Sequence, residues 1–384
     1  ASHAQLLAYL LPLVQAIKHE RHLPIPPAEA PLAALLIERA VTSAAKAAAA
    51  SASAATGAAT AAESLSAALT LSSCGDVSGT ALGGGNTSCD LAVFFHWYLR
   101  GEESDPRHGP HFLAVHEALL AQLQHSAAGS ELSATLSLQE SLVASLSAVA
   151  STLKGSGESR PKRIARLRAM FDAGGALHSL RALQSPLRLP LNPSLCIVGA
   201  VPERATVFKS ALSPLGLTFV VAPTPWTSDL HYSIIFKSGD DMRQDQLVLE
   251  MLRLMDALFK EQGLNLRLTP YRVLATAPGQ GLVERVPDCM PLAQVLAENR
   301  NDIRRFLQKF HPDEHAPHGI APEVLENFVK SCAGYCVVMY VMGVGDRHLD
   351  NLMLCSNGVL FHIDFGFILG RDPKPFPQRR IFAR

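Results

Sequence analysis

The chain has 384 residues, of which 48% are hydrophobic and 18% are charged, and this size predicts two or three domains with real cores. Its 34 basic and 34 acidic side chains give a formal net charge of zero, which excludes a global field that would favour nucleic acid or acidic lipid. The seven cysteines are scattered, without zinc-ligand spacing, and fit a reducing, cytosolic setting. Cys332 and Cys336, one helical turn apart, are predicted to be core residues rather than a redox or metal pair.

The N-terminal part of the chain has the pattern of helices. Residues 1–41 contain two apolar periodic stretches. Residues 42–90 are almost entirely Ala, Ser, Thr and Gly, and we expect a disordered insertion because few large apolar groups are available to bury. A helical segment is predicted at 91–154. We expect no signal peptide and no membrane span, and residues 333–345 are predicted to form a buried helix.

The second half of the chain changes in texture. Residues 155–193 are predicted to be a linker region with some helical character. Short β-branched or apolar runs then predict five strands, at 195–198, 206–208, 218–221, 232–236 and 272–276. Between them lies a strong helical pattern at 242–262, which Asp240 or Asp241 is predicted to cap and Gly263 to end. Strands around one helix, then a hinge and a mostly helical segment, predict an α+β, two-lobed fold.

Three side chains near the C-terminus have the chemistry of phosphoryl transfer. That reaction needs oxygen ligands for a metal, a cation on the phosphates and a group that orients the attacking hydroxyl. Asn351 and Asp364 supply metal-binding oxygens, and an apolar run at 359–363 is expected to hold Asp364 at the end of a strand. Phe365 and Gly366 complete the triplet Asp-Phe-Gly that protein kinases also use.

The loop before Asn351 departs from the protein-kinase order. Protein kinases have His-Arg-Asp, whereas this chain has Asp346-Arg347-His348, with the five-residue step from Asp346 to Asn351 retained. A neutral His348 is a candidate acceptor for the proton of an alcohol. Asp350, adjacent to Asn351, is as compatible with capping or solvating the loop as with a part in the chemistry.

Two lysines are candidate phosphate ligands. Lys237 ends an alternating strand ahead of the strong helix, where a kinase-type lysine reaches the α- and β-phosphates. Asp245, in the first turn of that helix, is a candidate to orient Lys237, or simply complements the helix dipole. Lys209 and Ser210 are weaker candidates, since the chain contains neither a glycine-rich repeat nor a Walker A motif there.

These segments resemble the phosphatidylinositol 3-/4-kinase superfamily, whose catalytic loop has the same Asp-Arg-His order. The resemblance is closest to class III phosphatidylinositol 3-kinases, the lipid kinases of vacuolar sorting and autophagy. It covers most of the chain outside the Ala/Ser-rich stretch. It is carried by the segments FFHWYL (94–99), IVGAVPERATVFKSAL (197–212), FKSGDDMRQDQ (236–246), LTPYRVLAT (268–276), VKSCAGYCVVMYVMGVGDRHLDN (329–351) and FHIDFGFILGRDPKP (361–375).

The resemblance implies a domain plan. Residues 1–41 would be the end of a helical accessory domain, 194–286 the kinase N-lobe with its hinge, and 287–384 a partial C-lobe that ends in the activation loop. The chain would be a C-terminally truncated fragment, because 376–384 departs from the family pattern, and we expect weak or no activity from this exact chain. The resemblance leaves two alternative functions open, a lipid-kinase-like protein kinase and a non-catalytic nucleotide-binding scaffold.

The resemblance also implies roles for individual residues, with ATP and Mg²⁺ or Mn²⁺ as cofactors. Lys237 would hold ATP phosphates, supported by Asp245 and Tyr271. The backbone of a hinge formed by Glu284, Arg285 and Val286 would contact adenine. His348 would be the base for the inositol 3-hydroxyl, acting beside Asp346. The metal would be held by Asn351 and Asp364.

The resemblance finally implies a substrate and a setting. The segment Gly370-Arg371-Asp372-Pro373-Lys374-Pro375 lacks the basic cluster that class I enzymes have there, which fits phosphatidylinositol itself as substrate. The product would be phosphatidylinositol 3-phosphate, in endosomal trafficking and autophagy. The expected partners are a pseudokinase-type regulatory subunit and a coiled-coil autophagy adaptor, with no nucleic acid. The expected location is cytoplasmic, peripheral on endosomal, vacuolar or autophagosomal membranes.

Overall fold

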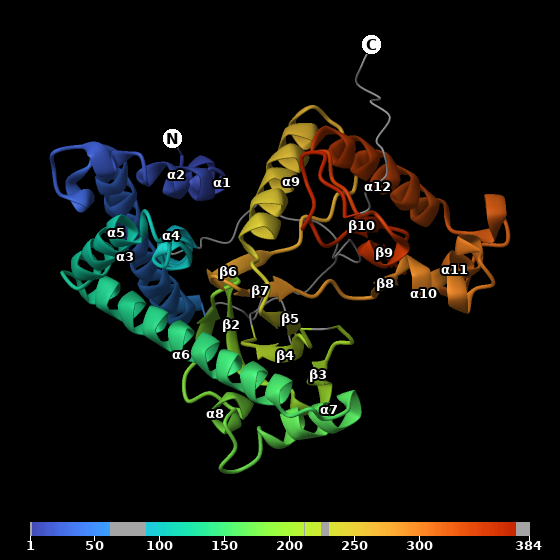
Figure 1. Ribbon diagram of the computed structural model, residues 1–384, viewed down its shortest axis with the longest axis horizontal. Coiled ribbons are helices and arrows are strands. Elements are labelled where there is room, and N and C mark those ends of the chain that lie inside the picture. The colour runs from blue at the N-terminus through green and yellow to red at the C-terminus, as the bar shows by residue number, and fades with distance from the viewer. Residues whose placement is uncertain (1, 62–89, 211, 224–229, 374–384) are drawn as a thin grey trace. The chain divides into compact units, whose positions relative to one another are not determined.

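The computed structural model describes residues 2–61, 90–210, 212–223 and 230–373 (Figure 1). The chain folds into two compact units. The first, the helical unit, comprises Ala1–Tyr232, Phe236–Asp240 and Ala275–Gly281, and the second, the loop-bearing unit, comprises Ser233–Ile235, Asp241–Leu274 and Leu282–Arg384. Each is described by itself. Helices and strands are both abundant, which confirms the predicted α+β class.

Most helices of the first unit form one apolar cluster. Helix α4 contacts α2, α3 and α5, and α6 packs on α3 and α5 (Figure 1). The large side chains Phe95, Trp97 and Phe112 lie in this core with at most 2% of their surface exposed. The helices of this unit are α1 (His3–Ala8), α2 (Leu10–Ile17), α3 (Pro31–Ala61), α4 (Asp90–Glu102), α5 (Gly109–Leu123), α6 (Ala127–Gly155), α7 (Arg160–Ala169) and α8 (His178–Arg181).

Helix α3 corrects the expectation for residues 42–90. The helix continues to Ala61, so the predicted disorder is wrong for 42–61, and residues 62–89 lie outside the described part of the chain. The physical reason is that alanine has the highest intrinsic helix propensity, and Pro31–Val41 supplies an amphipathic start from which the helix propagates. The expected linker at 155–193 is also structured, because it contains α7, α8 and strand β1 (Leu187–Leu189).

A seven-stranded sheet has the strand order β1-β2-β4-β5-β7-β6, with β3 paired to β4. All five predicted strands are present, and sequence patterns missed β1 and β7. Strand β2 pairs antiparallel with β4, with Ile197 opposite Val221. The remaining strands of the sheet are β2 (Asn192–Ala200), β3 (Thr206–Val207), β4 (Leu215–Val221), β5 (His231–Ser238), β6 (Val273–Ala277) and β7 (Gln280–Glu284).

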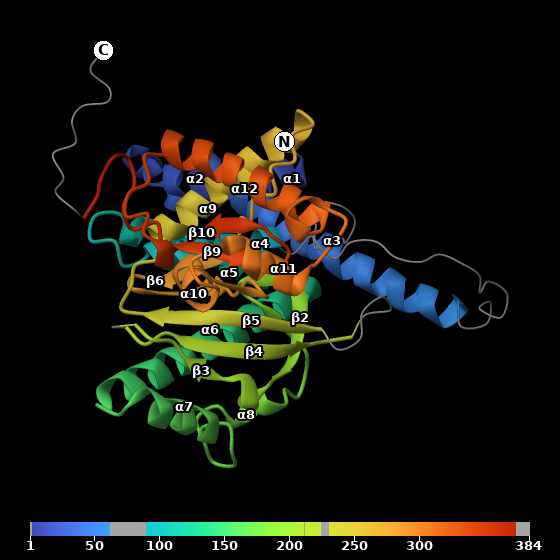
Figure 2. The same ribbon diagram turned by 90° about the vertical axis from the view of Figure 1, so that its right-hand side faces the viewer.

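The second unit combines helices with a small antiparallel sheet of order β10-β9-β8, of which Figure 2 labels β9 and β10. Helix α12 packs on β10, and α10 packs on β8 and β9. Its core includes Val295, Phe306, Ile320 and Leu354. The elements are α9 (Arg243–Glu261), α10 (Leu292–Glu298), α11 (Ile303–Phe310), α12 (Pro322–Val341), β8 (Cys289–Pro291), β9 (Leu352–Cys355) and β10 (Leu360–His362).

The start of helix α9 differs from the prediction, and its end agrees with it. The N-cap residue is Met242, Asp240 pairs with Lys237, and Asp241 accepts from the Arg243 backbone N–H at 3.1 Å. Gly263 adopts a φ of +76°, the left-handed conformation that favours glycine after a helix.

Helix α12 is long and apolar enough to cross a membrane by length and composition alone, whereas the sequence analysis expected no span. Two observations mark it as a core helix instead. Tyr335 and Val338 are at most 1% exposed, and the buried Ser331 hydroxyl accepts the Leu360 backbone N–H at 2.9 Å. Its packed face therefore belongs to the core of the loop-bearing unit, and the prediction of a buried helix holds for that face. The predicted core position is wrong for Cys336, which lies on the exposed side of the helix, while Cys332 is half-buried.

Candidate active site

The loop-bearing unit places the Asp-Arg-His loop between α12 and β9, directly against the backbone that follows Asp-Phe-Gly. Gly345 N–H donates to the Phe367 carbonyl at 2.9 Å, and Gly370 N–H donates to the Gly343 carbonyl at 2.8 Å. A Cβ on Gly345 would lie 2.2 Å from the Arg371 carbonyl oxygen, so this approach requires glycine. The glycines of GVGDRH thus allow the Asp-Arg-His loop to contact the segment after Asp-Phe-Gly, a contact that the sequence pattern did not predict.

Strand β10 ends at His362 and delivers Asp364, as predicted from the apolar run at 359–363. Asp364 and Asp346 both adopt positive φ angles, +61° and +53°, which are uncommon for residues other than glycine. Phe365 is fully buried and anchors the turn. Backbone strain of this kind is concentrated at functional sites, where surrounding contacts enforce it.

The contacts that enforce this backbone come mainly from Arg347. Its guanidinium donates to the carbonyls of Gly345 at 2.8 Å, Ile363 at 2.9 Å and Asp364, and it lies 5.7 Å from the Phe365 ring centroid. Burial lowers the pKa of Arg347, while the carboxylates of Asp364 and Asp346 oppose that shift. The Arg347 side chain therefore hydrogen-bonds to the backbone of both the Asp-Arg-His loop and the Asp-Phe-Gly segment.

Asn351 makes a second connection between the two segments. Its side-chain NH₂ group donates to the Asp346 backbone carbonyl at 3.0 Å, and the Asn351 backbone carbonyl accepts the Ile363 N–H at 3.0 Å. The amide nitrogen is thereby committed to the protein, and the amide oxygen is the atom suited to a cation. Asn351 and Asp364 together offer two hard oxygen ligands, which is the number that Mg²⁺ commonly takes from a protein when substrate phosphates and water complete its shell.

The donor chemistry therefore fits a phosphate-bound divalent cation better than an all-protein cage. In the described part of the chain, no group of three or more His, Cys, Asp or Glu side chains is arranged to hold a metal ion. Asp364 is exposed, and its carboxylate accepts the Gly366 N–H at 3.3 Å. An exposed carboxylate is accessible to a metal that arrives with nucleotide.

His348 lies at the entrance of the same loop with 45% of its side chain exposed. Its Nδ1 accepts the Asp350 backbone N–H at 3.2 Å, so the neutral ring carries its proton on Nε2. Nε2 is 3.8 Å from an Asp346 carboxylate oxygen. In this arrangement Asp346 is placed to stabilise an imidazolium, and Nδ1 accepts a further proton only when the Asp350 bond opens. In this contact His348 caps the turn with its side chain and Asp350 contributes only its backbone N–H, so the role of the Asp350 carboxylate stays a prediction.

Two residues at the start of α9 hold the Asp-Phe-Gly segment from the other side. The Asp245 carboxylate accepts the Phe365 N–H at 2.7 Å, and the Gln244 side-chain amide donates to the Phe365 carbonyl at 2.7 Å. Both main-chain groups of Phe365 are thus satisfied by adjacent residues of one helix turn. The predicted role of Asp245 in orienting Lys237 stays a prediction.

Aromatic side chains pack behind the site. Tyr271 is buried and meets Phe361 edge to face, with centroids 6.0 Å apart. Burial, with the nearby Asp245 charge, raises the Tyr271 pKa well above its usual value, so the phenol stays protonated. The His362 ring stacks on Tyr335 at 4.9 Å, and burial, with the Arg347 charge, lowers its pKa to about 4. Uncharged aromatic rings of β10 and its neighbours thus pack together just before Asp364.

The predicted hinge residues lie in the same unit, at and just after the end of β7. Glu284 N–H donates to the Arg272 carbonyl at 2.8 Å, and Arg285 N–H donates to the Ser233 carbonyl at 3.0 Å. The Val286 carbonyl accepts the Cys289 thiol at 3.2 Å. The backbone of these residues is therefore held in place, and its contact with adenine stays a prediction.

The predicted phosphate ligands Lys237, Lys209 and Ser210 belong to the helical unit. The Lys237 ammonium is 3.1 Å from the Asp240 carboxylate and 23% exposed, and Lys209 and Ser210 are exposed just after β3. Their part in phosphate binding stays a prediction.

The sequence comparison places the Asp-Arg-His and Asp-Phe-Gly segments within one family. Residues 231–381 match the family described as "Phosphatidylinositol 3- and 4-kinase". Residues 231–381 belong to this family. Its kinase domain implies a nucleotide and a divalent metal, in agreement with the donor set of Asn351 and Asp364.

Curated members of the phosphatidylinositol 3- and 4-kinase family resemble the chain well beyond that segment. "Phosphatidylinositol 3-kinase, nodule isoform" from Glycine max is 46% identical over 295 residues, which is 75% of this chain and 35% of the relative. "Phosphatidylinositol 3-kinase pik3" from Schizosaccharomyces pombe is 38% identical over 384 residues, covering 98% of this chain and 41% of the relative.

A third relative bears on the predicted class. "Phosphatidylinositol 3-kinase catalytic subunit type 3" from Caenorhabditis elegans is 34% identical over 392 residues, covering 98% of this chain and 42% of the relative. The expected resemblance to class III enzymes is confirmed. The chain spans roughly a third to two fifths of the length of the curated relatives it matches.

Sequence reasoning missed Arg347 and Gln244 as site residues. Arg347 was treated only as the centre of the Asp-Arg-His order, although a long guanidinium in a glycine-flanked loop is well suited to bind several carbonyls. Gln244 precedes Asp245 in the segment RQDQ, and no periodicity marks its partner, the Phe365 carbonyl.

Proposed function

We propose that this chain carries the phosphotransfer centre of a lipid kinase that uses ATP to phosphorylate the inositol 3-hydroxyl of phosphatidylinositol. The observation that carries the proposal is the fastening of the Asp-Arg-His loop to the Asp-Phe-Gly backbone through Arg347 and Asn351. This arrangement holds His348, Asn351 and Asp364 in one unit, with a base candidate and two metal-binding oxygens on adjacent backbone segments.

The chemistry follows from these residues. Asn351 and Asp364 would hold Mg²⁺ or Mn²⁺, and a bound divalent cation supplies charge neutralisation for the phosphates. Lys237 would contact the α- and β-phosphates, with Tyr271 and Asp245 supporting that region, and Lys209 and Ser210 would add contacts.

His348 would accept the proton of the attacking hydroxyl at Nδ1 once the bond from the Asp350 N–H opens, and Asp346, 3.8 Å from Nε2, would stabilise the imidazolium. The distance fits a supporting charge rather than a direct hydrogen bond. The backbone of Glu284–Val286 would meet adenine and fix the position of the nucleotide relative to this base.

A pair of variants separates the proposed roles. His348→Ala should abolish phosphate transfer in the full-length protein and leave ATP binding nearly unchanged. Asp364→Asn should instead weaken Mg²⁺-dependent nucleotide binding as well as transfer. Equilibrium binding of a fluorescent ATP analogue, with and without Mg²⁺, measures the difference. Loss of nucleotide binding in His348→Ala would contradict the base role.

The setting of the enzyme is part of the same proposal. We infer a peripheral membrane protein of the cytoplasm, acting on endosomal, vacuolar or autophagosomal membranes with a pseudokinase-type subunit and a coiled-coil adaptor. The formal net charge of zero supports a local or partner-mediated membrane contact rather than a global one. Imaging of the tagged full-length protein with an endosomal marker tests the location, and a uniform cytoplasmic signal would contradict it.

A further inference from the structure

Two cysteines far apart in sequence lie side by side on adjacent strands of the small sheet in the loop-bearing unit. Cys289 in β8 is directly opposite Cys355 in β9, in antiparallel register. Ser356 N–H donates to the Asp288 carbonyl at 2.9 Å, while Cys355 N–H donates to Val359. The inter-strand hydrogen bond therefore joins the neighbouring residues Asp288 and Ser356. Cys289 and Cys355 are then a non-hydrogen-bonded pair of the ladder.

That position in the ladder sets the spacing of the two residues. Non-hydrogen-bonded pairs of antiparallel strands have Cα atoms about 4.5 Å apart and the closer side chains. Disulfides span Cα separations of roughly 4.4–6.8 Å. Both cysteines are free thiols here, and the spacing typical of their pair type lies within the range that a disulfide spans.

The two thiols have unequal chemistry. The Cys355 thiol hydrogen-bonds to Cys289, which lowers the Cys289 pKa against the opposing effect of burial, and the positive charge of Arg285 lowers it further. The same bond, with burial, raises the Cys355 pKa. Cys289 is half-buried, whereas Cys355 is 7% exposed. Cys289 is therefore the thiol that both reaches solvent and ionises first.

We propose that Cys289 and Cys355 are a redox modification site, at which a peroxide converts the two thiols into a reversible cross-strand disulfide. In a reducing compartment such a bond is transient and reports oxidising episodes, which agrees with the cytosolic setting expected from the cysteine pattern.

The Cys289 thiolate attacks one peroxide oxygen, the O–O bond breaks, and the leaving hydroxide takes a proton to become water, so sulfur is oxidised to sulfenic acid and peroxide is reduced. Cys355 then attacks the Cys289 sulfur, and its proton leaves with the sulfenic hydroxyl as a second water. A dithiol reductant reverses the bond by exchange.

The modification has a consequence for nucleotide binding that rests on the proposed function. The Cys289 thiol donates to the Val286 carbonyl at 3.2 Å, in the segment proposed to meet adenine. A disulfide has no S–H and removes this bond. Strand β9, which carries Cys355, begins directly after Asn351. We expect oxidation to weaken nucleotide affinity several-fold.

Peptide mapping after peroxide treatment of the chain tests the disulfide directly. Without reductant, trypsin should release peptides 286–300 and 348–371 as one disulfide-linked species that dithiothreitol separates, since each contains a single cysteine. Cys289→Ser and Cys355→Ser should each abolish that species. In Cys355→Ser, a dimedone-type probe should label Cys289.

The two cysteines of α12 provide a matched control. The double variant Cys332→Ser/Cys336→Ser removes two thiols of α12 and should form the 289–355 link like the parent chain. Over-oxidation of Cys289 to sulfinic acid without the link would overturn the proposal. So would two unmodified thiols at a peroxide dose that oxidises Cys336, an exposed thiol of α12.

A second readout separates this inference from the proposed function. The affinity for a fluorescent ATP analogue should fall several-fold on oxidation of the parent chain and stay constant in Cys355→Ser. Equal affinity in the reduced and cross-linked forms would overturn the link to the hinge and leave the disulfide standing. Absence of nucleotide binding in both forms would instead overturn the proposed function.

Discussion

At the scale of single residues, Arg347 connects more of the site than any residue singled out from the sequence. It binds the carbonyls of Gly345, Ile363 and Asp364, two of which flank the Asp364 carboxylate. A planar guanidinium satisfies this set because its donors spread in a fixed fork, whereas an ammonium concentrates its donors at one point. We therefore regard Arg347 as a positioning residue, acting through Asp364 and the loop.

Arg347→Lys should retain the charge but lose the simultaneous contacts to both backbone segments. We expect kcat for lipid phosphorylation to fall by about tenfold, which corresponds to about 1.4 kcal/mol of lost transition-state stabilisation. The KM for ATP should change by only about twofold. Steady-state kinetics of the full-length protein measure both values.

The control for this prediction is Arg304→Lys, on an exposed arginine of α11 that pairs with Asp302. It should leave both constants unchanged. Equal losses in kcat from the two substitutions would show that Arg347 has no special positioning role.

Residue types and spacing predicted much of the candidate site, but not its connections. The Asp346–Asn351 step and the strand before Asp364 are local patterns, and the structure places these residues together as expected. The contact between Asp245 and the Phe365 N–H joins α9 to a turn far along the chain, and such pairs leave no periodic signature. The same applies to Cys289 and Cys355.

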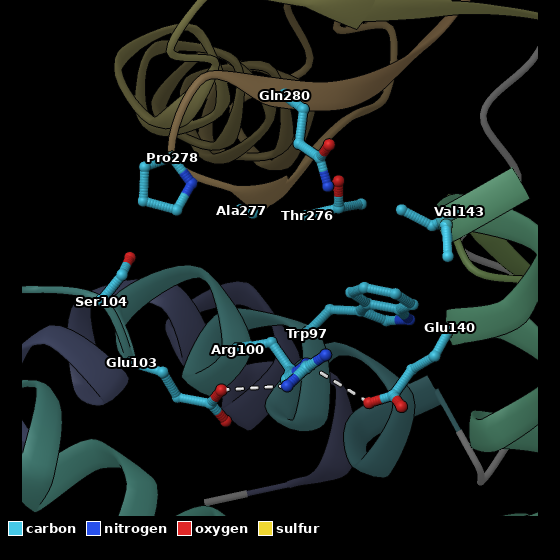
Figure 3. A pocket seen from close by; sticks show the side chains of 11 residues that line it. Trp97, Arg100, Glu103, Ser104, Glu140, Val143, Thr276, Ala277, Pro278 and Gln280 are labelled. Atoms are coloured by element: carbon cyan, nitrogen blue, oxygen red, sulfur yellow. Dashed lines mark hydrogen bonds and ion pairs between the residues drawn. The ribbon is translucent and has the colours of Figure 1, made fainter. Parts of the chain in front are cut away.

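At the scale of elements, helices α4, α5 and α6 share a buried polar network. His116 Nε2 is 2.8 Å from His96 Nδ1, and His116 Nδ1 is 2.5 Å from the Glu103 carboxylate. Arg100 bridges Glu103 and Glu140, at 3.1 and 3.3 Å, beside a cavity of about 300 Å³ (Figure 3). The network links three helices through polar and charged side chains, in addition to their apolar packing.

This network predicts acid sensitivity. Burial, then the charges of His116 and Arg100, lowers the His96 pKa well below its usual value, so the unfolded state binds a proton first and stability falls as pH drops below about 6.5. Burial raises the Glu103 pKa, but the bond to His116 and the charges of His116 and Arg100 lower it overall. Its contribution is lost at still lower pH, as Glu103 is protonated.

Trp97 fluorescence in a Trp226→Phe background should therefore report a lower denaturation midpoint at pH 5.5 than at pH 7.5. The double variant His96→Leu/His116→Leu should lose most of the difference between pH 7.5 and 5.5. An equal pH dependence in both proteins would show that the network is not responsible.

The loop and the segment after Asp-Phe-Gly form another element-scale contact. Gly345→Ala would place a Cβ 2.2 Å from the Arg371 carbonyl, and overpacking of this kind costs about 1–3 kcal/mol. Gly155→Ala, at the end of α6 with nothing within 4 Å of the added Cβ, should be neutral or slightly stabilising. Thermal unfolding compares the two, and similar midpoints would contradict the close approach.

Secondary structure was predictable to different degrees along the chain. The five strands with β-branched runs were found, because their pattern lies within the element. Strands β8, β9 and β10 are short, and of these only the segment of β10 was expected, from its position before Asp364. Helix α3 was cut short in the prediction, because an alanine-rich stretch with few apolar groups has helix propensity but no amphipathic signal.

At the scale of the whole molecule, the chain combines a helical unit with a unit that holds the Asp-Arg-His and Asp-Phe-Gly segments. Class and family were predictable because the diagnostic residues lie within two short segments, 343–351 and 361–366. The division into units was not predicted at the observed boundaries, since strands β5, β6 and β7 each contribute residues to both units.

The central claim is that this site transfers phosphate from ATP to the 3-hydroxyl of phosphatidylinositol. The most direct measurement offers the full-length protein phosphatidylinositol, its 4-phosphate and its 4,5-bisphosphate separately, and identifies the products by chromatography. We predict phosphatidylinositol 3-phosphate as the main product, a preference for the unphosphorylated headgroup, and loss of product in Asp364→Asn. A preference for the bisphosphate, or undiminished turnover in Asp364→Asn, would contradict the account.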